Sequence, residues 1–234
     1  MKVLGFDTAT NWCTTGLIDD KELIAEWTIK SKMTQLNRLI PGISMLLKEK
    51  ELKFSDLSAI SVTIGPGSFT GVRLGLVTAK TLSQVSGLPV IGINSLEALV
   101  FQCPVKNSLI VPVIDARKNQ VFAGFYRWEE DKIIVIEEGK IFTPEELAEE
   151  INKKQEYCYL TGEGLEPYIN IISKNLSLSV TFLPSFYGII RGATVAIMGK
   201  DRINAGYEDS YIDLAPIYIR PPDAKISQRS IYES

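Results

Sequence analysis

The sequence of 234 residues contains no histidine at all. This absence excludes Ser-His-Asp and Cys-His catalysis, metal sites built on histidine, and histidine general bases. Carboxylates, hydroxyls, thiols, lysine or a bound nucleotide with its metal are the remaining sources of chemistry. A hydrolase is therefore a poor prediction from the outset.

Cysteine is also scarce, because the three cysteines lie far apart and form no Cys-x-x-Cys pair. An odd, scattered count favours reduced thiols in a cytoplasmic protein. The start of the chain does not fit a signal peptide. No apolar run approaches the ~20 residues that a membrane span needs, so we expect no membrane contact.

Basic charge is not in excess, since the formal net charge at pH 7 is −3 and the pI is about 5.3. A protein that binds nucleic acid by itself usually carries a basic face. We therefore expect negligible affinity of this chain alone for RNA, and any contact with nucleic acid to be made through a partner.

Strand and helix patterns alternate along the chain, which predicts an α/β fold. The predicted strands cover residues 3–6, 13–18, 23–29, 59–64, 89–93, 109–114 and 157–160. The predicted helices cover 34–50, 70–86, a short stretch from 95, 144–154, 165–174 and 194–205. Thr34 is a candidate cap of the first helix, and Pro41 should kink that helix or displace its first turn.

The two halves of the sequence begin alike when they are compared at an offset of 108 residues. Val3 matches Val111, Asp7 matches Asp115 and Gly16 matches Gly124, and an acidic hairpin tip follows in each half. This similarity suggests an internal duplication. We predict two related lobes, 1–104 and 105–220, each a mixed sheet with helices, and a flexible tail at 221–234.

A glycine-rich loop follows the predicted strand at 59–64 and opens the helix at 70–86. Its residues Gly65, Gly67 and Ser68 supply bare backbone and a helix cap, an arrangement that can hold phosphate. The loop lacks the lysine of a Walker A motif and does not match the dinucleotide fingerprint. It is equally consistent with a sharp, capped turn.

Asp7 and Thr8 end the first predicted strand and form a second candidate site. A carboxylate and a hydroxyl at this place can hold a hydrated metal ion and phosphate oxygens, although a simple turn is the commoner explanation. Together with Gly65, Gly67 and Ser68 they define a predicted remnant of a phosphate cradle.

The matching loop of the second half, residues 115–119, is poorly suited to phosphate. It carries Arg117 and Lys118 instead of glycines, so a surface salt bridge is the favoured role. Residues 161–164 could border a base pocket, or could equally form a turn that begins a helix. Only half of a nucleotide site is therefore visible.

The helices at 34–50 and 70–86 are apolar on more than one face. Burial within their own lobe is the default explanation, and an interface between subunits is the rival one. The residues predicted to form such an interface are Leu39, Ile43, Leu46, Gly71, Leu74, Gly75, Leu76 and Thr78.

Four stretches, MKVLGFDTAT, IGPGSFTGVRLGLVTAKTL, IDARKNQVFAGFY and LAPIYIR, together resemble the bacterial TsaB (YeaZ) family over nearly the whole chain. The resemblance implies the fold of actin, Hsp70 and the sugar kinases. It further implies a non-catalytic, activating subunit in threonylcarbamoyl transfer to the tRNA adenosine beside the anticodon. The catalytic partner of the family, TsaD, uses a metal bound by histidine.

The same resemblance implies that the two apolar helices contact TsaD, or a second copy of the chain in isolation, and that the ATPase TsaE docks on the pair. We expect no cofactor of this chain's own, with ATP or ADP held at a subunit interface mainly by the partners. The chain departs from the family at Met33 and at Asn119-Gln120. These departures lower the expectation of nucleotide chemistry.

Two other functions compete with this interpretation. A small-molecule kinase of the same fold would use Asp7 and the glycine loop to bind ATP. A peptidase would need Ser-Lys or aspartate chemistry, and the sequence shows no such constellation.

Overall fold

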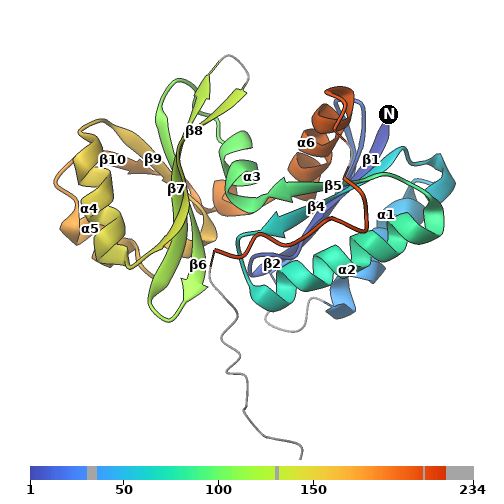
Figure 1. Cartoon of the computed structure of the whole chain (residues 1–234), viewed down its shortest axis with the longest axis horizontal. Helices are drawn as coiled ribbons and strands as arrows, with labels where there is room; N and C mark the ends of the chain where they lie inside the picture. Colours follow the sequence, from blue (N-terminus) through green and yellow to red (C-terminus); the bar gives the residue numbers. More distant parts are fainter. Residues whose placement is uncertain (31–35, 130–131, 208, 220–234) are drawn as a thin grey trace, which may run out of the picture.

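The computed structural model describes residues 1–30, 36–129, 132–207 and 209–219. The predicted cap Thr34, part of the hairpin tip at 129–131 and the tail 221–234 lie outside these ranges. The chain forms two mixed sheets that stand side by side, with helices on their faces (Figure 1).

Each sheet has five strands, and the two sheets share one topology. The first has the order β3-β2-β1-β4-β5 and the second the order β8-β7-β6-β9-β10. The first sheet consists of β1 (Lys2–Asp7), β2 (Trp12–Asp19), β3 (Glu22–Lys30), β4 (Ala59–Gly65) and β5 (Val90–Asn94). The second consists of β6 (Leu109–Arg117), β7 (Gln120–Glu129), β8 (Lys132–Phe142), β9 (Cys158–Thr161) and β10 (Val180–Phe182).

The strand pairing confirms that the two halves are related. Strand β1 is antiparallel to β2 and parallel to β4, and β6 is antiparallel to β7 and parallel to β9. The two aspartates that match at the offset of 108, Asp7 and Asp115, lie near the carboxyl ends of the central strands β1 and β6. The prediction of an α/β fold of two related mixed sheets is confirmed. Strand β10 was not predicted, because its three residues are too few to show a pattern.

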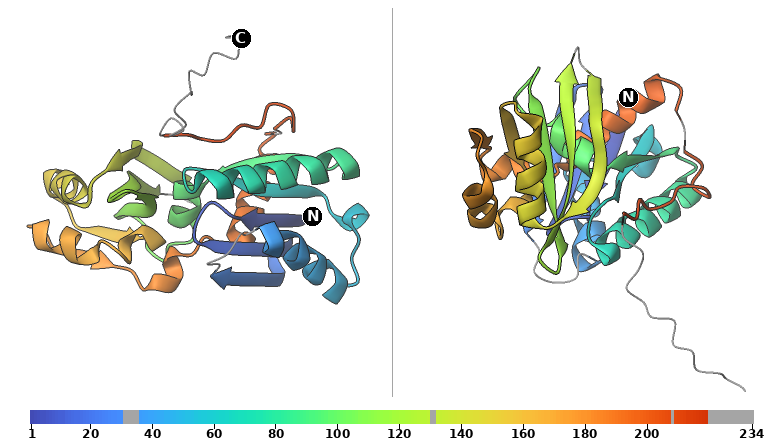
Figure 2. Two further views of the ribbon diagram at one scale, coloured as in Figure 1. Left: turned by 90° about the horizontal axis from the view of Figure 1, so that it is seen from below. Right: turned by 60° about the vertical axis from the view of Figure 1, so that its left-hand side comes forward.

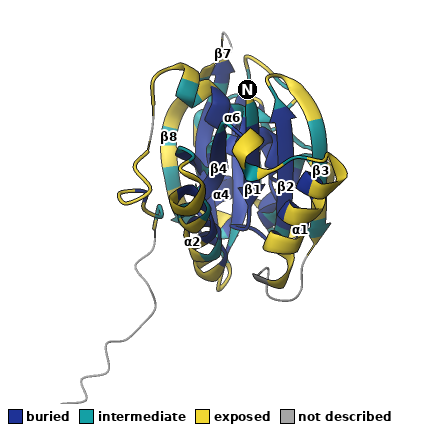
Figure 3. Cartoon of the chain, turned by 90° about the vertical axis from the view of Figure 1, so that its right-hand side faces the viewer, coloured by how far each residue is buried: buried dark blue, intermediate teal, exposed yellow. Residues whose placement is uncertain are grey.

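Six α-helices lie in the described ranges. They are α1 (Leu36–Glu49), α2 (Phe69–Ser86), α3 (Ser95–Phe101), α4 (Pro144–Lys154), α5 (Ile169–Asn175) and α6 (Gly192–Asn204). Helices α1 and α2 cover one face of the first sheet and α6 covers the other, as Figures 2 and 3 show. Strand β1 alternates accordingly, because Leu4 and Phe6 join the core under α1 and α2, whereas Val3 joins the core under α6.

Helix α6 lies so close to the first sheet that only glycine fits between them. A Cβ atom on Gly5 would lie 2.3 Å from the backbone nitrogen of Ala196, and one on Gly16 would lie 2.1 Å from that of Ala193. The chain therefore returns from the second lobe to complete the first. The predicted second lobe, 105–220, includes this helix, so the structural boundary differs from the predicted one.

The two lobes also share a core. One cluster of buried side chains joins Ile91 and Ile93 of β5 and Leu96 of α3 to Ile110 of β6 and Tyr126 of β7. Helix α3 thus lies between the two sheets and packs on the second. The lobes are related in topology but are not separate hydrophobic units.

Candidate functional site

The carboxylate of Asp7 is fully buried at the end of β1, and its oxygens already have partners. Oδ1 accepts hydrogen bonds from the hydroxyl of Thr63 at 2.6 Å and the backbone N–H of Ala9 at 3.0 Å. Oδ2 accepts one from the hydroxyl of Thr10 at 2.9 Å. The donors Ala9 and Thr10 close the turn after β1 around the carboxylate, and Thr63 reaches the carboxylate from β4. The turn explanation considered for this segment is therefore the one that the geometry supports.

Burial raises the pKa of Asp7 to about 6, although the three hydrogen bonds oppose this shift. The carboxyl group is held by two hydroxyls and one backbone amide of its own chain. Among the described residues, no group of three or more aspartate, glutamate or cysteine side chains is arranged to hold a metal ion.

The glycine loop packs directly against the turn that follows β1. The N–H of Ser68 donates to the carbonyl of Ala9 at 2.7 Å, and a Cβ atom on Gly67 would lie 2.3 Å from that same carbonyl oxygen. Gly65 has a φ of +103° and therefore the backbone freedom that this loop needs. The structure brings the predicted cradle residues close together, but Asp7, Thr8 and Ser68 use their polar groups on other residues of their own chain.

The start of helix α2 is satisfied from within the chain as well. Ser68 is its N-cap, with Oγ accepting from the N–H of Gly71 at 3.4 Å, and Thr8 donates its hydroxyl to the carbonyl of Gly71 at 2.7 Å. The buried Thr8 fits because Gly75 opposite has no side chain. The loop and the turn thus fix the direction of α2, and this is the role that their contacts support.

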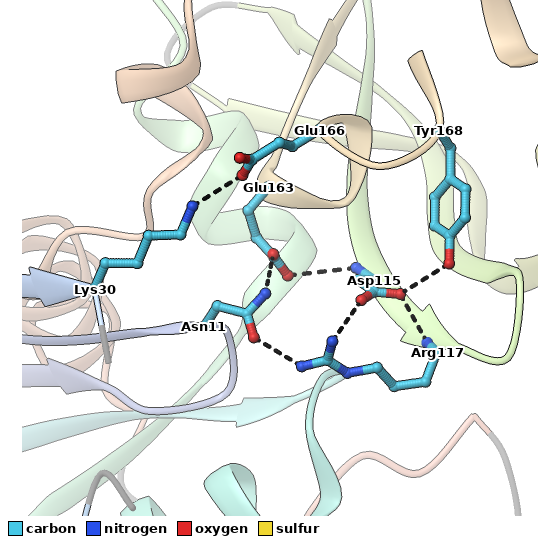
Figure 4. Close-up of polar contacts among 7 residues, drawn as sticks. All are labelled: Asn11, Lys30, Asp115, Arg117, Glu163, Glu166 and Tyr168. Atoms are coloured by element: carbon cyan, nitrogen blue, oxygen red, sulfur yellow. Dashed lines mark hydrogen bonds and ion pairs between the residues drawn. The ribbon is translucent and has the colours of Figure 1, made fainter. Parts of the chain in front are cut away.

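The corresponding turn of the second lobe forms a polar cluster between the lobes (Figure 4). Asp115 pairs with Arg117 at 3.0 Å, which confirms the predicted salt bridge, and Arg117 also donates to Oδ1 of Asn11 at 2.8 Å. Nδ2 of Asn11 donates to Glu163 at 2.7 Å. Residues of the two lobes therefore bond across the space between the carboxyl ends of β1 and β6.

Glu163 is a half-buried member of this cluster. Its second oxygen accepts from the N–H of Asp115 at 3.4 Å, and burial raises the pKa of its carboxyl group. An exposed ion pair between Lys30 and Glu166, 2.9 Å apart, joins the lobes nearby. Of the two explanations considered for residues 161–164, the turn that begins a helix is the one that the structure supports, because Gly162 is the N-cap of a short 3-10 helix at Glu163–Leu165, and Glu163 bridges the lobes. Its partner, Asn11, gave no signal beyond its position in a turn.

The residues predicted to form an interface on α1 and α2 lie mostly inside the protein. They fall into two groups by how far each residue is exposed to solvent. Leu39, Ile43, Leu46, Gly71, Gly75, Leu76 and Thr78 are buried, and Leu74 is half-buried. Seven of the eight predicted residues thus pack within their own lobe and are not available to a partner in this conformation.

The outer sides of the same helices are exposed, as the yellow ribbon of α1 and α2 in Figure 3 shows, and they carry large apolar side chains among polar ones. The exposed apolar residues there are Ile40, Met45, Phe69, Val77 and Val85. Val77 is 63% exposed, although its neighbour Leu76 is only 4% exposed. None of these five residues was among those predicted for an interface, because both helices are apolar around most of their circumference. We call Ile40, Met45, Phe69, Val77 and Val85 the outer helix face.

The segment 209–219 lies beside α2 and extends this surface. Phe69 and Tyr218 stack with their ring centroids 5.3 Å apart. The guanidinium of Arg73 lies 3.8 Å from the Phe69 ring centroid and donates to the Tyr218 hydroxyl at 2.9 Å. Lys80 holds the carbonyl of Ile212 at 3.1 Å. The aromatic and cationic side chains are therefore held in place by contacts within the chain.

Comparison with known proteins places this arrangement in context. Residues 31–201 match the family described as "TsaD: tRNA N6-adenosine threonylcarbamoyltransferase". The chain is 30% identical over 171 residues to the tRNA threonylcarbamoyladenosine biosynthesis protein TsaB of Escherichia coli strain K12, covering 72% of this chain and 74% of that protein. It is 27% identical to the TsaB of Bacillus subtilis strain 168 over 225 residues, 96% of each chain.

The fold is shared with solved structures as well. YeaZ from Pseudomonas aeruginosa superimposes with a TM-score of 0.79 at 20% identity, covering 93% of this chain and 99% of that one. The architecture is that of the actin, Hsp70 and sugar-kinase class, as predicted. Within the described parts of the chain, no helix is both long enough and apolar enough to cross a membrane.

Proposed function

The chain belongs to the family described as tRNA N6-adenosine threonylcarbamoyltransferase and to its TsaB proteins, and on this premise we propose that it is a non-catalytic subunit that binds and activates TsaD. Its part in forming threonylcarbamoyladenosine on tRNA is then to hold the catalytic subunit in an active arrangement. The outer helix face is the observation that carries this proposal.

The residue composition of the chain and the contacts of Asp7 favour a non-catalytic role over a catalytic one. It has no histidine to bind the metal that the family's catalytic member uses. Asp7, the best candidate for catalysis, accepts hydrogen bonds from three groups of its own chain and is fully buried. The same burial argues against the alternative of a small-molecule kinase, because ATP and its metal ion would have to displace these bonds.

The outer helix face supports the contact with TsaD. Large apolar side chains exposed on the outer sides of two helices favour burial against another protein. In the absence of TsaD, a second copy of the chain is the proposed occupant, and TsaE is proposed to dock on the pair with TsaD. We propose that any ATP or ADP lies at a subunit interface. The chain contacts tRNA only through its partners, and the complex works in the cytoplasm.

Val77→Glu tests this proposal. The substitution puts a charge at the centre of the proposed contact while leaving the core intact, because the side chain of Val77 is 63% exposed. We expect the affinity for TsaD, measured by isothermal titration calorimetry, to fall about 30-fold or more. Light scattering should show that the Val77→Glu variant alone is a monomer, whereas we expect the unaltered chain alone to be a dimer.

Val135→Glu in β8 is the matched control, because it places the same charge on an exposed valine of the other lobe. It should bind TsaD like the unaltered chain. If Val77→Glu assembles normally, the contact does not involve the outer helix face. A chain that ignores TsaD but binds ATP tightly, with binding lost in Asp7→Ala, would instead support the kinase.

A further inference from the structure

The chain crosses between the lobes twice, and one side chain lies where the crossings meet. The first crossing begins at Gln102, which caps the carboxyl end of α3. The second is the segment between β10 and α6. Both crossings must bend if the lobes are to move against each other, as the lobes of ligand-closing enzymes do.

The side-chain amide of Gln102 binds the second crossing with all of its polar atoms. Its Nε2 donates to the carbonyls of Tyr187 and Ile189, each at 2.7 Å. Its Oε1 accepts from the N–H of Arg191 and from the hydroxyl of Thr194, each at 3.3 Å. The amide nitrogen of Gln102 faces two carbonyl oxygens, and its oxygen faces one N–H and one hydroxyl. This network therefore fixes the orientation of the amide.

These partners belong to different lobes. The carbonyl of Tyr187 also accepts from the hydroxyl of Thr161 in β9 at 3.1 Å, which fixes it to the second lobe. A Cβ atom on the adjacent Gly188 would lie 2.8 Å from the carbonyl carbon of Gly162, so this turn is packed tightly on that lobe. Gln102 itself is the C-cap of α3, the helix that follows β5 of the first sheet and lies between the two sheets.

The far side of the crossing is fixed to the first lobe. Thr14 of β2 donates to the carbonyl of Ile190 at 2.9 Å, and Glu26 of β3 accepts from the N–H of Ala193 at 3.1 Å and pairs with Arg191. Only residues 188–189 separate the anchor on one lobe from the anchor on the other. The amide of Gln102 bonds on both sides of this short gap.

We propose that Gln102 is a latch that fixes the angle between the two lobes, so that the chain acts as one rigid body and does not open and close around a ligand. The polar cluster of Asn11, Arg117 and Glu163 joins the lobes at a second place, at the carboxyl ends of β1 and β6. Two attachments at different points restrain rotation more than either one alone. This proposal concerns the motion of the chain itself and does not depend on the proposed function.

The test uses the full-length chain with spin labels at Glu22→Cys in β3 and Glu149→Cys in α4, both exposed positions, and with Cys103→Ala throughout. Pulsed electron paramagnetic resonance then measures the distance between the lobes. We expect one narrow distance distribution with Gln102 present and a broader one in Gln102→Ala. Gln102→Glu should act in the same way, because it sets a carboxylate oxygen against the carbonyls of Tyr187 and Ile189.

Hydrogen exchange provides a second measurement on the same variants. Amides of residues 185–195 should exchange about tenfold faster or more in Gln102→Ala, since all four hydrogen bonds of the Gln102 side chain are lost. Gln84→Ala, an exposed glutamine on α2, is the control and should change neither measurement.

A broad distribution in the unaltered protein would overturn the proposal, whatever the variants do. It would also be overturned if both Gln102 variants fold and keep the original distance distribution and exchange rates. If neither variant folds, a narrow distribution in the unaltered protein still supports a rigid body.

Discussion

At the scale of single residues, the hydrogen-bond partners of Asp7 decide between two roles of its side chain. A carboxylate at the end of a central strand can face a ligand or can organise its own turn. Here the hydroxyls of Thr10 and Thr63 and the N–H of Ala9 occupy its oxygens. The sequence placed Asp7 at the end of the first strand, as the structure does, but the donor that lies 56 positions away, Thr63, cannot be identified as its partner from sequence spacing.

The raised pKa of Asp7 makes a prediction about stability. The native carboxyl group titrates at about pH 6, above its ordinary value of 3.8, so the folded protein binds more protons than the unfolded chain between these values. The contribution of this group to stability therefore falls as the pH rises from about 4 to about 6. Asp7→Asn removes this dependence.

Urea unfolding of both proteins at several pH values measures the effect. Relative to the unaltered protein, Asp7→Asn should gain up to about 3 kcal/mol between pH 4 and pH 6 and change little at higher pH. Comparing the two proteins cancels the contributions of Glu97 and Glu163, whose pKa values are also raised by burial. A difference that is constant with pH would contradict the shift.

At the scale of elements, α2 shows what local sequence can and cannot decide. Ser68 and Gly87 mark the two ends of the helix as N-cap and left-handed C-cap, so its limits were predicted within one residue. Which side faces solvent was not predictable, because apolar residues almost encircle the helix. The packing of the sheet against Val72, Leu76 and Ala79 makes that choice.

Adjacent substitutions on α2 should therefore have opposite consequences. Leu76→Glu places a charge in the core and should cost about 3 to 5 kcal/mol of unfolding free energy. Val77→Glu places the same charge in solvent and should change that free energy by less than about 1 kcal/mol. Urea or thermal denaturation followed by circular dichroism measures both. Equal losses would mean that α2 is rotated relative to the arrangement described.

At the scale of the whole molecule, the return of α6 to the first sheet controls how the chain can be divided. The predicted unit 1–104 lacks the helix that covers Gly5 and Gly16 and buries Val3 and Ile18. One face of its sheet would be open to water. The first lobe is thus built from two segments that lie far apart in the sequence.

A fragment of residues 1–104 should therefore not fold by itself. Fusing residues 189–219 to it through a flexible linker should restore a cooperative unfolding transition, because the fusion returns α6 and the segment beside α2. Circular dichroism melting curves compare the two proteins. A cooperative transition in the fragment 1–104 alone would show that α6 is dispensable to the first lobe.

The sequence by itself determined the alternation of strands and helices, the duplicated strand pattern and the exclusion of histidine chemistry, because these depend on residue type and on local periodicity. It also carried the family resemblance in four stretches. The tertiary structure alone decided which apolar residues are core and which are surface, the pairing of Asn11 with Glu163 and the bonds of Gln102. These contacts join residues up to 152 positions apart, and only the packing of the whole chain brings such residues together.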